Sequence, residues 1–392
     1  MKPREKFNKY IILIYLLIGI SFYSCTKVEL RKIDSPAYLR VFNDLRFKMT
    51  LEDKNLGLSV VTMLINPEYN ESGEPISAEI VGDYLITRNL YAAPHPSFIG
   101  NSIDRYNPEY PGKEVVMAGP ILNGFDLSTW AQVPSGKHRV AFYLRPKSEV
   151  PFFSLEKRYR EKAIVDTTID LAPQEVYTMH VLQKDFETKE ICMLLRQENF
   201  HKLALSDTLV YVNFYNYSAK GFYAAPSNEK PGARKSFYTV SNGFPEDVHV
   251  YFSLFNKPDL EDGVLVEGYD RVFMTNLLRD NDNNLPNKYH SIPLRKKGND
   301  SMKSDLAQVL NFAVPWVDIH ARNTVRTQII FYKDGNAIAP WASFGTLMPN
   351  MIVSTHSGVH NPRSFGTVNS FEIVNGDIYL TTVQRVYDRP IY

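Results

Sequence analysis

The chain has 392 residues, a net charge of +1 and an aromatic content of 13%. This length allows two domains, each with its own core. The near-neutral charge provides no basic surface for nucleic acid, so we expect no nucleic-acid partner. Tyrosine and phenylalanine, at 24 and 23 residues, exclude a disordered chain and favour strands over helices.

Residues 1–24 have the pattern of a bacterial lipoprotein signal peptide. Basic residues between Lys2 and Lys9 are followed by an apolar run, and the small residue Ser24 precedes Cys25. Because a small residue before a cysteine resembles a lipobox, we expect the Cys25 thiol to be acylated. The apolar run is about half as long as the ~20 residues that a membrane-spanning helix needs. An ordinary cleaved signal, in which Cys25 is incidental, is the alternative.

Lipidation at Cys25 predicts attachment to a membrane through lipid chains, with residues 25–33 as a short tether. We expect the protein at the outer membrane, either on its periplasmic side or exposed at the surface. The other cysteine, Cys192, lies in an apolar run, which is typical of a buried thiol. No internal disulfide is therefore expected, and stability has to come from the burial of a core.

An internal repeat suggests two copies of one domain. Residues 34–43 align without a gap to residues 207–216, and they share the pattern Asp-[Ser/Thr]-x-x-Tyr-[Leu/Val]-x-[Val/Phe]-[Phe/Tyr]-Asn. Each copy is predicted to be a strand that ends in a turn-forming asparagine. Residues 176–181 resemble residues 378–383 more weakly, which suggests a shared late strand.

Domain 1 is predicted over residues 34–200, with a long insertion over residues 66–115. Strands are expected at residues 139–144 and 165–171, as well as in the late segment from residue 176. Residues 153–160 have a helical pattern, but they are too short and charged for a core helix. Strands and turns that alternate at short intervals are typical of a β-sandwich.

Domain 2 is predicted over residues 205–392. Strands are expected at residues 248–255 and 327–332, and Asp334-Gly335 after the second strand indicates a hairpin turn. Residues 304–310 are predicted to form one short helix. The predicted fold is all-β, with two tandem Ig-like β-sandwich domains after a lipoprotein signal peptide.

The signal that ends at Cys25 and the two units with the repeated opening strand resemble Bacteroidota lipoproteins of unknown function. Two further patterns carry this resemblance: the turn Ser135-Gly136-Lys137 before a strand, and Tyr177-Thr178 in the late strand. Proteins of this kind have tandem Ig-like β-sandwich domains, so the resemblance implies a fold and a compartment. It carries no catalytic residue.

The predicted insertion contains the most suggestive binding residues. Tyr69 and Tyr110 each end the sequence Asn-Pro-Glu-Tyr, and Tyr91 precedes Pro94. The segment Tyr91-Ala92-Ala93-Pro94 recurs in domain 2 as Tyr223-Ala224-Ala225-Pro226. Tyrosine rings present flat apolar faces with a polar tip, which suits a glycan or a protein ligand. We therefore take these three tyrosines as candidate ligand-binding residues. The tryptophans Trp130, Trp316 and Trp341 are expected to be core residues.

Catalytic and metal-binding patterns are weak. His356 and His360 have a metal-ligand spacing only on a helix, and Ser357-Gly358 between them favours a loop. Residues 280–284 resemble the start of a calcium loop, but Leu285 and Ser291 stand where glycine and an acidic residue are needed. The sequence has no nucleophile elbow and no phosphate-binding glycine loop. We expect no catalytic residue, metal or cofactor.

These observations predict a lipid-anchored envelope protein that acts as a non-enzymatic binding module for glycan or protein. The alternative is a structural or adhesin-like subunit whose loops and strand edges bind other subunits. A third hypothesis is a glycan-active hydrolase. Its two catalytic carboxylates would be brought together by the fold, so the sequence alone does not reveal such a pair.

Overall fold

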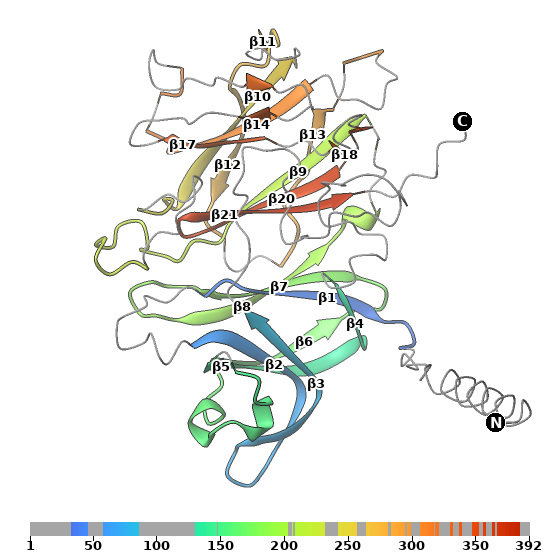
Figure 1. The fold of residues 1–392 in the computed structure, drawn as a ribbon, viewed down its shortest axis with the longest axis vertical. Helices are drawn as coiled ribbons and strands as arrows, with labels where there is room; N and C mark the ends of the chain where they lie inside the picture. Colours follow the sequence, from blue (N-terminus) through green and yellow to red (C-terminus); the bar gives the residue numbers. More distant parts are fainter. Residues whose placement is uncertain are drawn as a thin grey trace, which may run out of the picture. The chain divides into compact units, whose positions relative to one another are not determined.

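The computed structural model describes the following residues: 33–45, 58–85, 130–146, 148–202, 206, 208–231, 242–256, 264–280, 284–294, 296–298, 306–316, 318–320, 330–331, 337–338, 347–352, 356–357, 363–364 and 367–384. The regular structure of these residues is almost entirely β-strand, and none of them lies in a helix of seven or more residues (Figure 1), so the predicted all-β fold is confirmed. Residues 35–392 form one compact unit by their backbone contacts. Among the described residues, none lies in a helix long and apolar enough to span a membrane.

Domain 1 consists of two four-stranded sheets. One sheet has the order β4-β1-β7-β8 and the other has the order β3-β2-β5-β6. The strands are β1 (Ala37–Asn43), β2 (Leu58–Tyr69), β3 (Pro75–Leu85), β4 (Ala131–Val133), β5 (Gly136–Pro146), β6 (Val165–Leu171), β7 (Val176–Gln183) and β8 (Ile191–Glu198). Apolar side chains from both sheets, such as Val41 and Met179 from one and Met63 and Phe142 from the other, form a single buried cluster. The two sheets therefore form a β-sandwich.

Domain 2 repeats this arrangement. Its sheets have the orders β13-β9-β20-β21 and β11-β10-β14-β17, with β12 paired to β10 as well. The strands are β9 (Leu209–Asn216), β10 (Asp247–Asn256), β11 (Val264–Leu265), β12 (Val272–Leu278), β13 (His290–Pro293), β14 (Leu306–Ala313), β17 (Leu347–Ile352), β20 (Thr367–Val374) and β21 (Asp377–Gln384). A second buried cluster, which includes Phe214, Phe371, Val250 and Phe312, fills this sandwich.

The pairing of strands shows that the two domains are copies of one topology. The opening strand β1 pairs in parallel with β7, and β9 pairs in parallel with β20, whereas the other ladders are antiparallel. The pairing register places Phe42 opposite His180, and the equivalent residue Tyr215 opposite Glu372. The counterpart of β7 is therefore β20. The weaker sequence match between residues 176–181 and 378–383 was wrong, because residues 378–383 belong to β21, the counterpart of β8.

The asparagine that ends the repeated strand pattern makes equivalent hydrogen bonds in both domains. Asn43 accepts a hydrogen bond from the backbone N–H of Leu45 at 3.1 Å and donates to the carbonyl of Tyr84 at 3.0 Å. Asn216 accepts from the N–H of Ser218 at 3.2 Å and donates to the carbonyl of Pro245 at 3.1 Å. Each asparagine thus closes an Asx turn and fixes it, to β3 in domain 1 and to the segment just before β10 in domain 2.

The sheets that contain β7 and β20, called the facing sheets from here on, are buried on both sides. On β7, Met179 and Val181 point into the core of domain 1. Leu182 on its other side joins Tyr215, Tyr217 and Val374 of domain 2 in one apolar cluster, and a further cluster contains Val176 together with Val368. Because neighbours lie on both faces, seven consecutive residues of β7 are buried. The other two sheets are called the outer sheets.

Two expectations from the sequence need correction. Residues 306–310 of the predicted helix do not form one, since β14 begins at Leu306 and pairs with β10 and β17. Their helical spacing arose because both faces of β14 carry buried residues, and sheet pairing overrode it. Residues 66–69 and 75–85, the first part of the predicted insertion, belong to β2 and β3. Residues 86–115 lie outside the described part of the chain.

The segment expected to be weakly helical forms two single turns of 3-10 helix, η2 (Phe152–Ser154) and η3 (Lys157–Tyr159). Phe152 and Leu155 pack with Leu64, Ala141 and Tyr143 on the outer sheet of domain 1. This segment therefore covers part of the outer sheet.

The hairpin turn predicted at Asp334-Gly335 lies outside the described residues, but short strands lie on either side of it. β15 (Ile330–Phe331) and β16 (Ala337–Ile338) pair antiparallel. Another short antiparallel pair joins β18 (His356–Ser357) to β19 (Arg363–Ser364).

Candidate functional site

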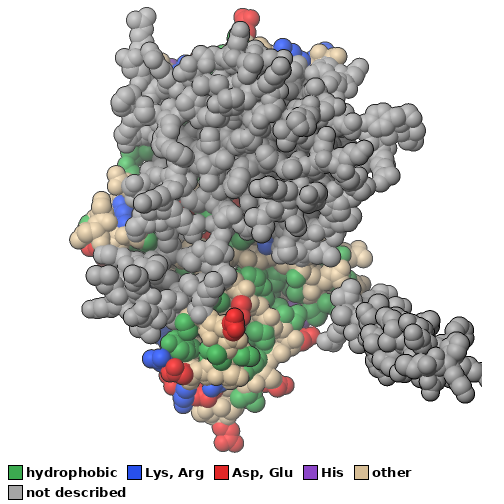
Figure 2. Space-filling model, viewed as in Figure 1, with side chains coloured by type: hydrophobic (Ala, Val, Ile, Leu, Met, Phe, Trp, Pro, Cys, Tyr) green, Lys and Arg blue, Asp and Glu red, His purple; other side chains and the backbone are tan. Residues whose placement is uncertain are grey.

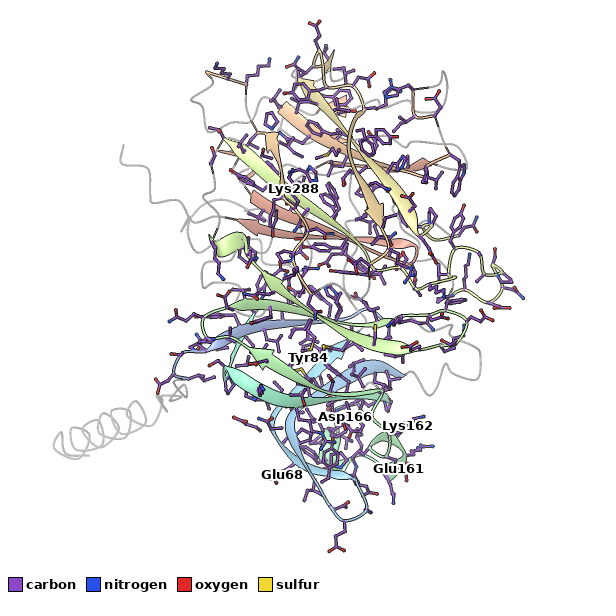
Figure 3. The ribbon with its side chains drawn as sticks, turned by 180° about the vertical axis from the view of Figure 1, so that it is seen from behind. Glu68, Tyr84, Glu161, Lys162, Asp166 and Lys288 are labelled. Carbon is purple, nitrogen blue, oxygen red and sulfur yellow. The ribbon has the colours of Figure 1, made fainter. Side chains whose placement is uncertain are left out.

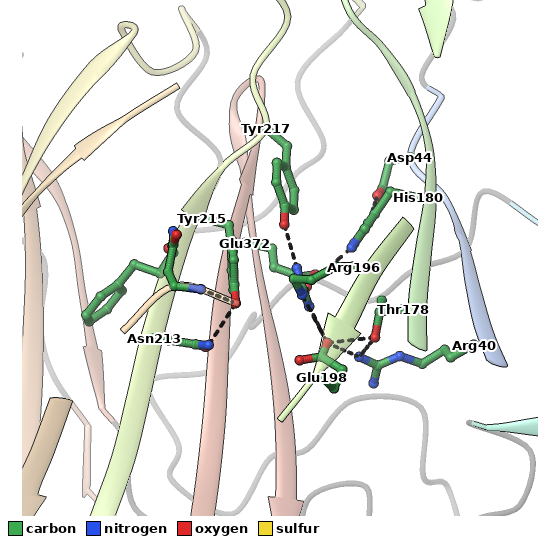
Figure 4. Close-up of polar contacts among 12 residues, drawn as sticks. Arg40, Asp44, Thr178, His180, Arg196, Glu198, Asn213, Tyr215, Tyr217 and Glu372 are labelled. Carbon is green, nitrogen blue, oxygen red and sulfur yellow. Dashed lines mark hydrogen bonds and ion pairs between the residues drawn. The ribbon is translucent and has the colours of Figure 1, made fainter. Parts of the chain in front are cut away.

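The densest group of chemically active side chains lies between the facing sheets (Figure 4). All of its members are buried, and they come from both domains. We call it the polar cluster, and it comprises Arg40, Asp44, Thr178, His180, Arg196, Glu198, Tyr215, Tyr217 and Glu372.

Arg196 on β8 is the centre of the polar cluster. Its guanidinium donates at 2.7 Å to Oε1 of Glu198 and at 2.7 Å to Oε1 of Glu372 on β20. It also donates to the hydroxyl of Tyr217 at 2.6 Å, and it lies 4.0 Å from the centroid of the Tyr215 ring. One arginine of domain 1 therefore contacts three side chains of domain 2. The planar guanidinium suits this role because it offers five donors in a fixed geometry.

His180 on β7 lies between two carboxylates. Its Nδ1 is 2.7 Å from Oδ2 of Asp44, and its Nε2 is 3.5 Å from Oε1 of Glu372. Asp44 follows β1 and belongs to the same domain as His180, whereas Glu372 belongs to domain 2. The imidazole therefore forms a second connection between the facing sheets.

Arg40 and Thr178 extend the polar cluster within domain 1. The Arg40 guanidinium donates to the Thr178 hydroxyl at 2.9 Å, and that hydroxyl donates to Glu198 at 2.8 Å. Arg40 also lies 3.8 Å above the ring of Trp130, a cation–π arrangement. Trp130 is buried, as expected for a core residue.

The electrostatics of the polar cluster favour ionised groups despite their burial. Burial alone would raise the pKa of Glu198, but the charges of Arg196 and Arg40 hold it below its ordinary value. Burial would likewise lower the pKa of Arg196, and Glu198 and the nearby tyrosines raise it well above its ordinary value. Burial raises the pKa of Tyr215 to about 12, so its hydroxyl stays neutral. The polar cluster is thus a buried network of ion pairs and hydrogen bonds.

The burial of the polar cluster limits which molecules can reach its side chains. Arg196, His180 and Glu372 are fully buried, so a substrate cannot reach them without separating the facing sheets. A carboxylate, an imidazole and a guanidinium at hydrogen-bond distance would suit acid–base chemistry in an open cleft. Here they connect the facing sheets of the two sandwiches.

A different feature presents aromatic side chains to solvent. Tyr223 and Trp316 lie on two loops of domain 2, and their ring centroids are 6.2 Å apart at an interplanar angle of 52°. Trp316 is 62% exposed and Tyr223 is 39% exposed. The expectation that Trp316 is a core residue was wrong. The neighbouring Val314 and Ile319 are the buried residues that hold this loop to the domain. We call Tyr223 and Trp316 the aromatic pair.

Of the predicted ligand-binding tyrosines, the structure describes Tyr69. It ends β2 on the outer sheet of domain 1, beside Glu68, which is labelled in Figure 3 together with Asp166. The guanidinium of Arg139 lies 4.6 Å from the centroid of the Tyr69 ring, and it is held there by two hydrogen bonds to Asp166, at 2.9 and 2.7 Å. One face of the Tyr69 ring is therefore already covered by the protein.

The other predicted site residues fall outside the described residues. These are Cys25, Tyr91 and Tyr110. His356 lies in β18, but His360 is likewise not described, and only the ends of the calcium-like segment 280–284 are. Within the described ranges, no group of three or more His, Cys, Asp or Glu side chains could hold a metal ion.

Hydrophobic side chains are also exposed on domain 1. Among the residues of domain 1 that the structure describes, the large ones are Ile76, Val81 and Val150. On the face drawn in Figure 2, the hydrophobic side chains of the described region are interspersed with charged ones.

No family model matches the chain, and no curated protein was found to be similar to it.

Proposed function

We propose that this chain is a lipid-anchored, non-enzymatic envelope protein that binds a glycan or protein ligand through the aromatic pair. The observation that carries this proposal is the exposure of Trp316 beside Tyr223. Tryptophan buries a large apolar area in most folds, so a tryptophan left mostly in water gains little from folding. Aromatic side chains exposed together on loops are typical of recognition surfaces.

The loop that holds Tyr223 is fixed from beneath, which supports a binding role. The ammonium of the buried Lys230 donates to the carbonyls of Tyr223 and Asn242, each at 2.9 Å. The adjacent Phe222 is buried and packs edge-on against Phe186, with ring centroids 5.0 Å apart. A loop already held in one conformation loses less entropy when a ligand binds.

Gly243 allows this packing. Its φ of +81° favours glycine, and a Cβ at this position would lie 2.5 Å from a ring carbon of Phe222. The backbone that carries Tyr223 is therefore positioned by a close approach that no other residue permits.

The lipid anchor at Cys25 and the location at the outer membrane rest on the signal pattern of the sequence. The test is direct: in a Cys25→Ser variant expressed in a bacterium, we expect loss of metabolic labelling with a fatty acid and release from the membrane fraction. If the variant stays in the membrane and the wild-type chain is not labelled, the anchor proposal is wrong.

The binding proposal is tested with soluble protein from Thr26 to Tyr392 on a glycan and matrix-protein array. We expect Trp316→Ala and Tyr223→Ala to abolish binding to any ligand that the wild type selects. Leu285→Ala is the matched control, because Leu285 is a large exposed apolar residue elsewhere on domain 2. Binding that survives both aromatic substitutions, or no selective binding by folded protein, would contradict the proposal.

The hydrolase reading has less support. Glu198 and Glu372, the two carboxylates brought to one guanidinium, are buried between the facing sheets. They are held by donors rather than poised around an open site.

A further inference from the structure

Two buried histidines of domain 1 lie in opposite hydrogen-bonding surroundings. His138 is on β5 and His180 is on β7. A neutral imidazole has one nitrogen that donates and one that accepts, whereas an imidazolium donates from both nitrogens. The groups that face the two nitrogens therefore indicate which form each histidine takes.

The surroundings of His138 fit a neutral ring. Its Nε2 lies 2.9 Å from the carbonyl oxygen of Pro134, so this nitrogen carries a hydrogen and donates it. Its Nδ1 lies 2.9 Å from the amide nitrogen of Asn66. The orientation of that amide is fixed, because its Oδ1 accepts from the backbone N–H of Arg139 at 3.1 Å. The amide nitrogen is a donor, so Nδ1 of His138 has to accept.

Both ring nitrogens of His180 face carboxylate oxygens (Figure 4). Nδ1 is 2.7 Å from Oδ2 of Asp44, and Nε2 is 3.5 Å from Oε1 of Glu372. A neutral ring would turn the lone pair of one nitrogen toward one of these oxygens, and an ionised carboxylate offers only lone pairs in return. The doubly protonated ring presents a hydrogen to each carboxylate.

The charges within the polar cluster favour the same form of His180. Apart from this histidine, its charged members are two arginines and three carboxylates: Arg40, Arg196, Asp44, Glu198 and Glu372. An imidazolium brings these members to three positive and three negative charges. Because an unbalanced charge is costly to bury, the balanced state is favoured.

Arg196 is the cation nearest to this contact among the members of the polar cluster. It donates at 2.7 Å to the same Oε1 of Glu372 that faces His180, so its charge opposes a second cation there. Arg196 also has Glu198 as an ion-pair partner at 2.7 Å, whereas Asp44 faces His180 from the other side. Each of the two cations thus has a carboxylate of its own in addition to the shared one.

Aromatic rings complete the surroundings of His180. The ring of Phe42 on β1 is 5.6 Å from the imidazole, and the ring of Tyr217, just after β9, is 5.0 Å from it. Burial raises the pKa of Tyr217, so its hydroxyl stays neutral and adds no negative charge. Aromatic rings at this distance are compatible with a cation.

We propose that His180 is an imidazolium at neutral pH and that its proton strengthens the contact between the facing sheets. With the proton bound, the ring connects Asp44 of domain 1 to Glu372 of domain 2. When the proton leaves, one of these carboxylates faces a lone pair instead of a donor. The contact between the two sandwiches is therefore sensitive to alkali, and this property does not depend on the function proposed for the aromatic pair.

The direction of the pH dependence follows from where the proton is bound. An ordinary histidine has a pKa of about 6.5, so the unfolded chain releases this proton above that pH. Because the folded chain keeps it, the unfolded state binds fewer protons and the stability falls as the pH rises. The stabilisation is complete below about pH 6.5, and it is lost as the pH rises to the point at which the folded ring releases its proton.

Nitrogen-15 NMR of the histidine rings in the wild-type chain tests the charge directly, because the two nitrogens of an imidazolium have similar shifts and those of a neutral ring do not. At pH 7.5 we expect the imidazolium pattern for His180 and the neutral pattern, with the hydrogen on Nε2, for His138. Glu372→Gln should move the titration of His180 down by about one pH unit or more, which is a ~10-fold weaker hold on the proton. Glu246→Gln, at an exposed carboxylate of domain 2, is the matched control and should leave this titration unchanged.

Urea denaturation between pH 7 and pH 9 tests the consequence for stability. We expect the unfolding equilibrium constant of the wild type to rise by about tenfold per pH unit more than that of His180→Gln, which corresponds to one proton. His138→Gln is the matched control. It should keep the pH dependence of the wild type, because a neutral ring carries no extra proton into the folded state.

Three results would overturn the proposal. A neutral His180 at pH 7.5 would place the proton elsewhere in the polar cluster. A His180 titration that Glu372→Gln leaves unchanged would show that the proton does not serve the contact between the sheets. Equal pH dependences of the wild type and His180→Gln would show that the proton does not stabilise the fold. If His180→Gln does not fold, the NMR titrations of the wild type and of Glu372→Gln decide.

Discussion

The facing sheets of the two domains are alike, whereas the outer sheets have diverged. The facing sheets share strand order, a parallel central pair and the same asparagine turn. The outer sheets share strand order as well, but Phe152 and Leu155 cover part of one, and the other exposes Phe273. A sheet buried on both faces is constrained at almost every residue, whereas a sheet with one free face can acquire new contacts.

The largest effect is expected when Arg196, the arginine at the centre of the contact between the facing sheets, is removed. Arg196→Ala leaves Glu198 and Glu372 buried without their guanidinium. We expect the free energy of unfolding to fall by about 3–5 kcal/mol, measured by urea denaturation, because an unpaired buried charge is costly. Arg139→Ala, which breaks the exposed ion pair with Asp166, is the control and should cost less than about 1 kcal/mol. A similar loss of unfolding free energy in both variants would show that the polar cluster does not hold the two facing sheets together.

The next largest effect is expected from acid, which should weaken the ion pair between Arg196 and Glu198. The pKa of Glu198 lies below its ordinary value of 4.5 in the folded protein, so its ionised form favours folding. This stabilisation is present above about pH 4.5 and is lost as the pH falls through the lowered pKa. We expect the melting temperature of Glu198→Gln to depend less steeply on pH in this range than that of the wild type. Parallel pH profiles would contradict this assignment.

The repeated asparagines give a smaller effect that tests the equivalence of the domains. Asn43→Ala and Asn216→Ala each remove two hydrogen bonds of the same geometry. We expect both substitutions to cost about 1–3 kcal/mol, since buried backbone groups lose their partners. Asn276→Ala, on the exposed side of β12, is the control. A large cost in one domain alone would show that the turn is not equivalent in the two copies.

The smallest effect on stability is expected at the aromatic pair. Trp316→Ala removes a ring that is mostly in water, so the free energy of unfolding should change by no more than about 0.5 kcal/mol. The same variant should lose ligand binding. A large destabilisation would indicate that Trp316 serves the fold rather than recognition.

Local patterns in the sequence were enough to predict the all-β fold and the repeat, because aromatic strands and an asparagine turn are encoded in consecutive residues. Trp316 was wrongly predicted to be a core residue, because the conformation of its loop, which decides whether the side chain is exposed, cannot be inferred from neighbouring residues. The 304–310 segment was misjudged because its spacing reflects burial on both faces of a sheet. The polar cluster was missed altogether, since Arg40, Arg196 and Glu372 are far apart in the chain. Arg196-Gln197-Glu198 at the end of an apolar run was the one available signal.

The contact between His180 and Glu372 has a consequence for the origin of the molecule. These residues occupy equivalent places in the two copies, as do Val176 and Val368, and each pair lies together between the facing sheets. Equivalent surfaces that meet each other are the mark of a symmetric dimer. In a dimer of identical chains, a residue at this place would meet itself, histidine against histidine or glutamate against glutamate. Joining both copies in one gene frees each position to change alone, so an imidazole can face a carboxylate here.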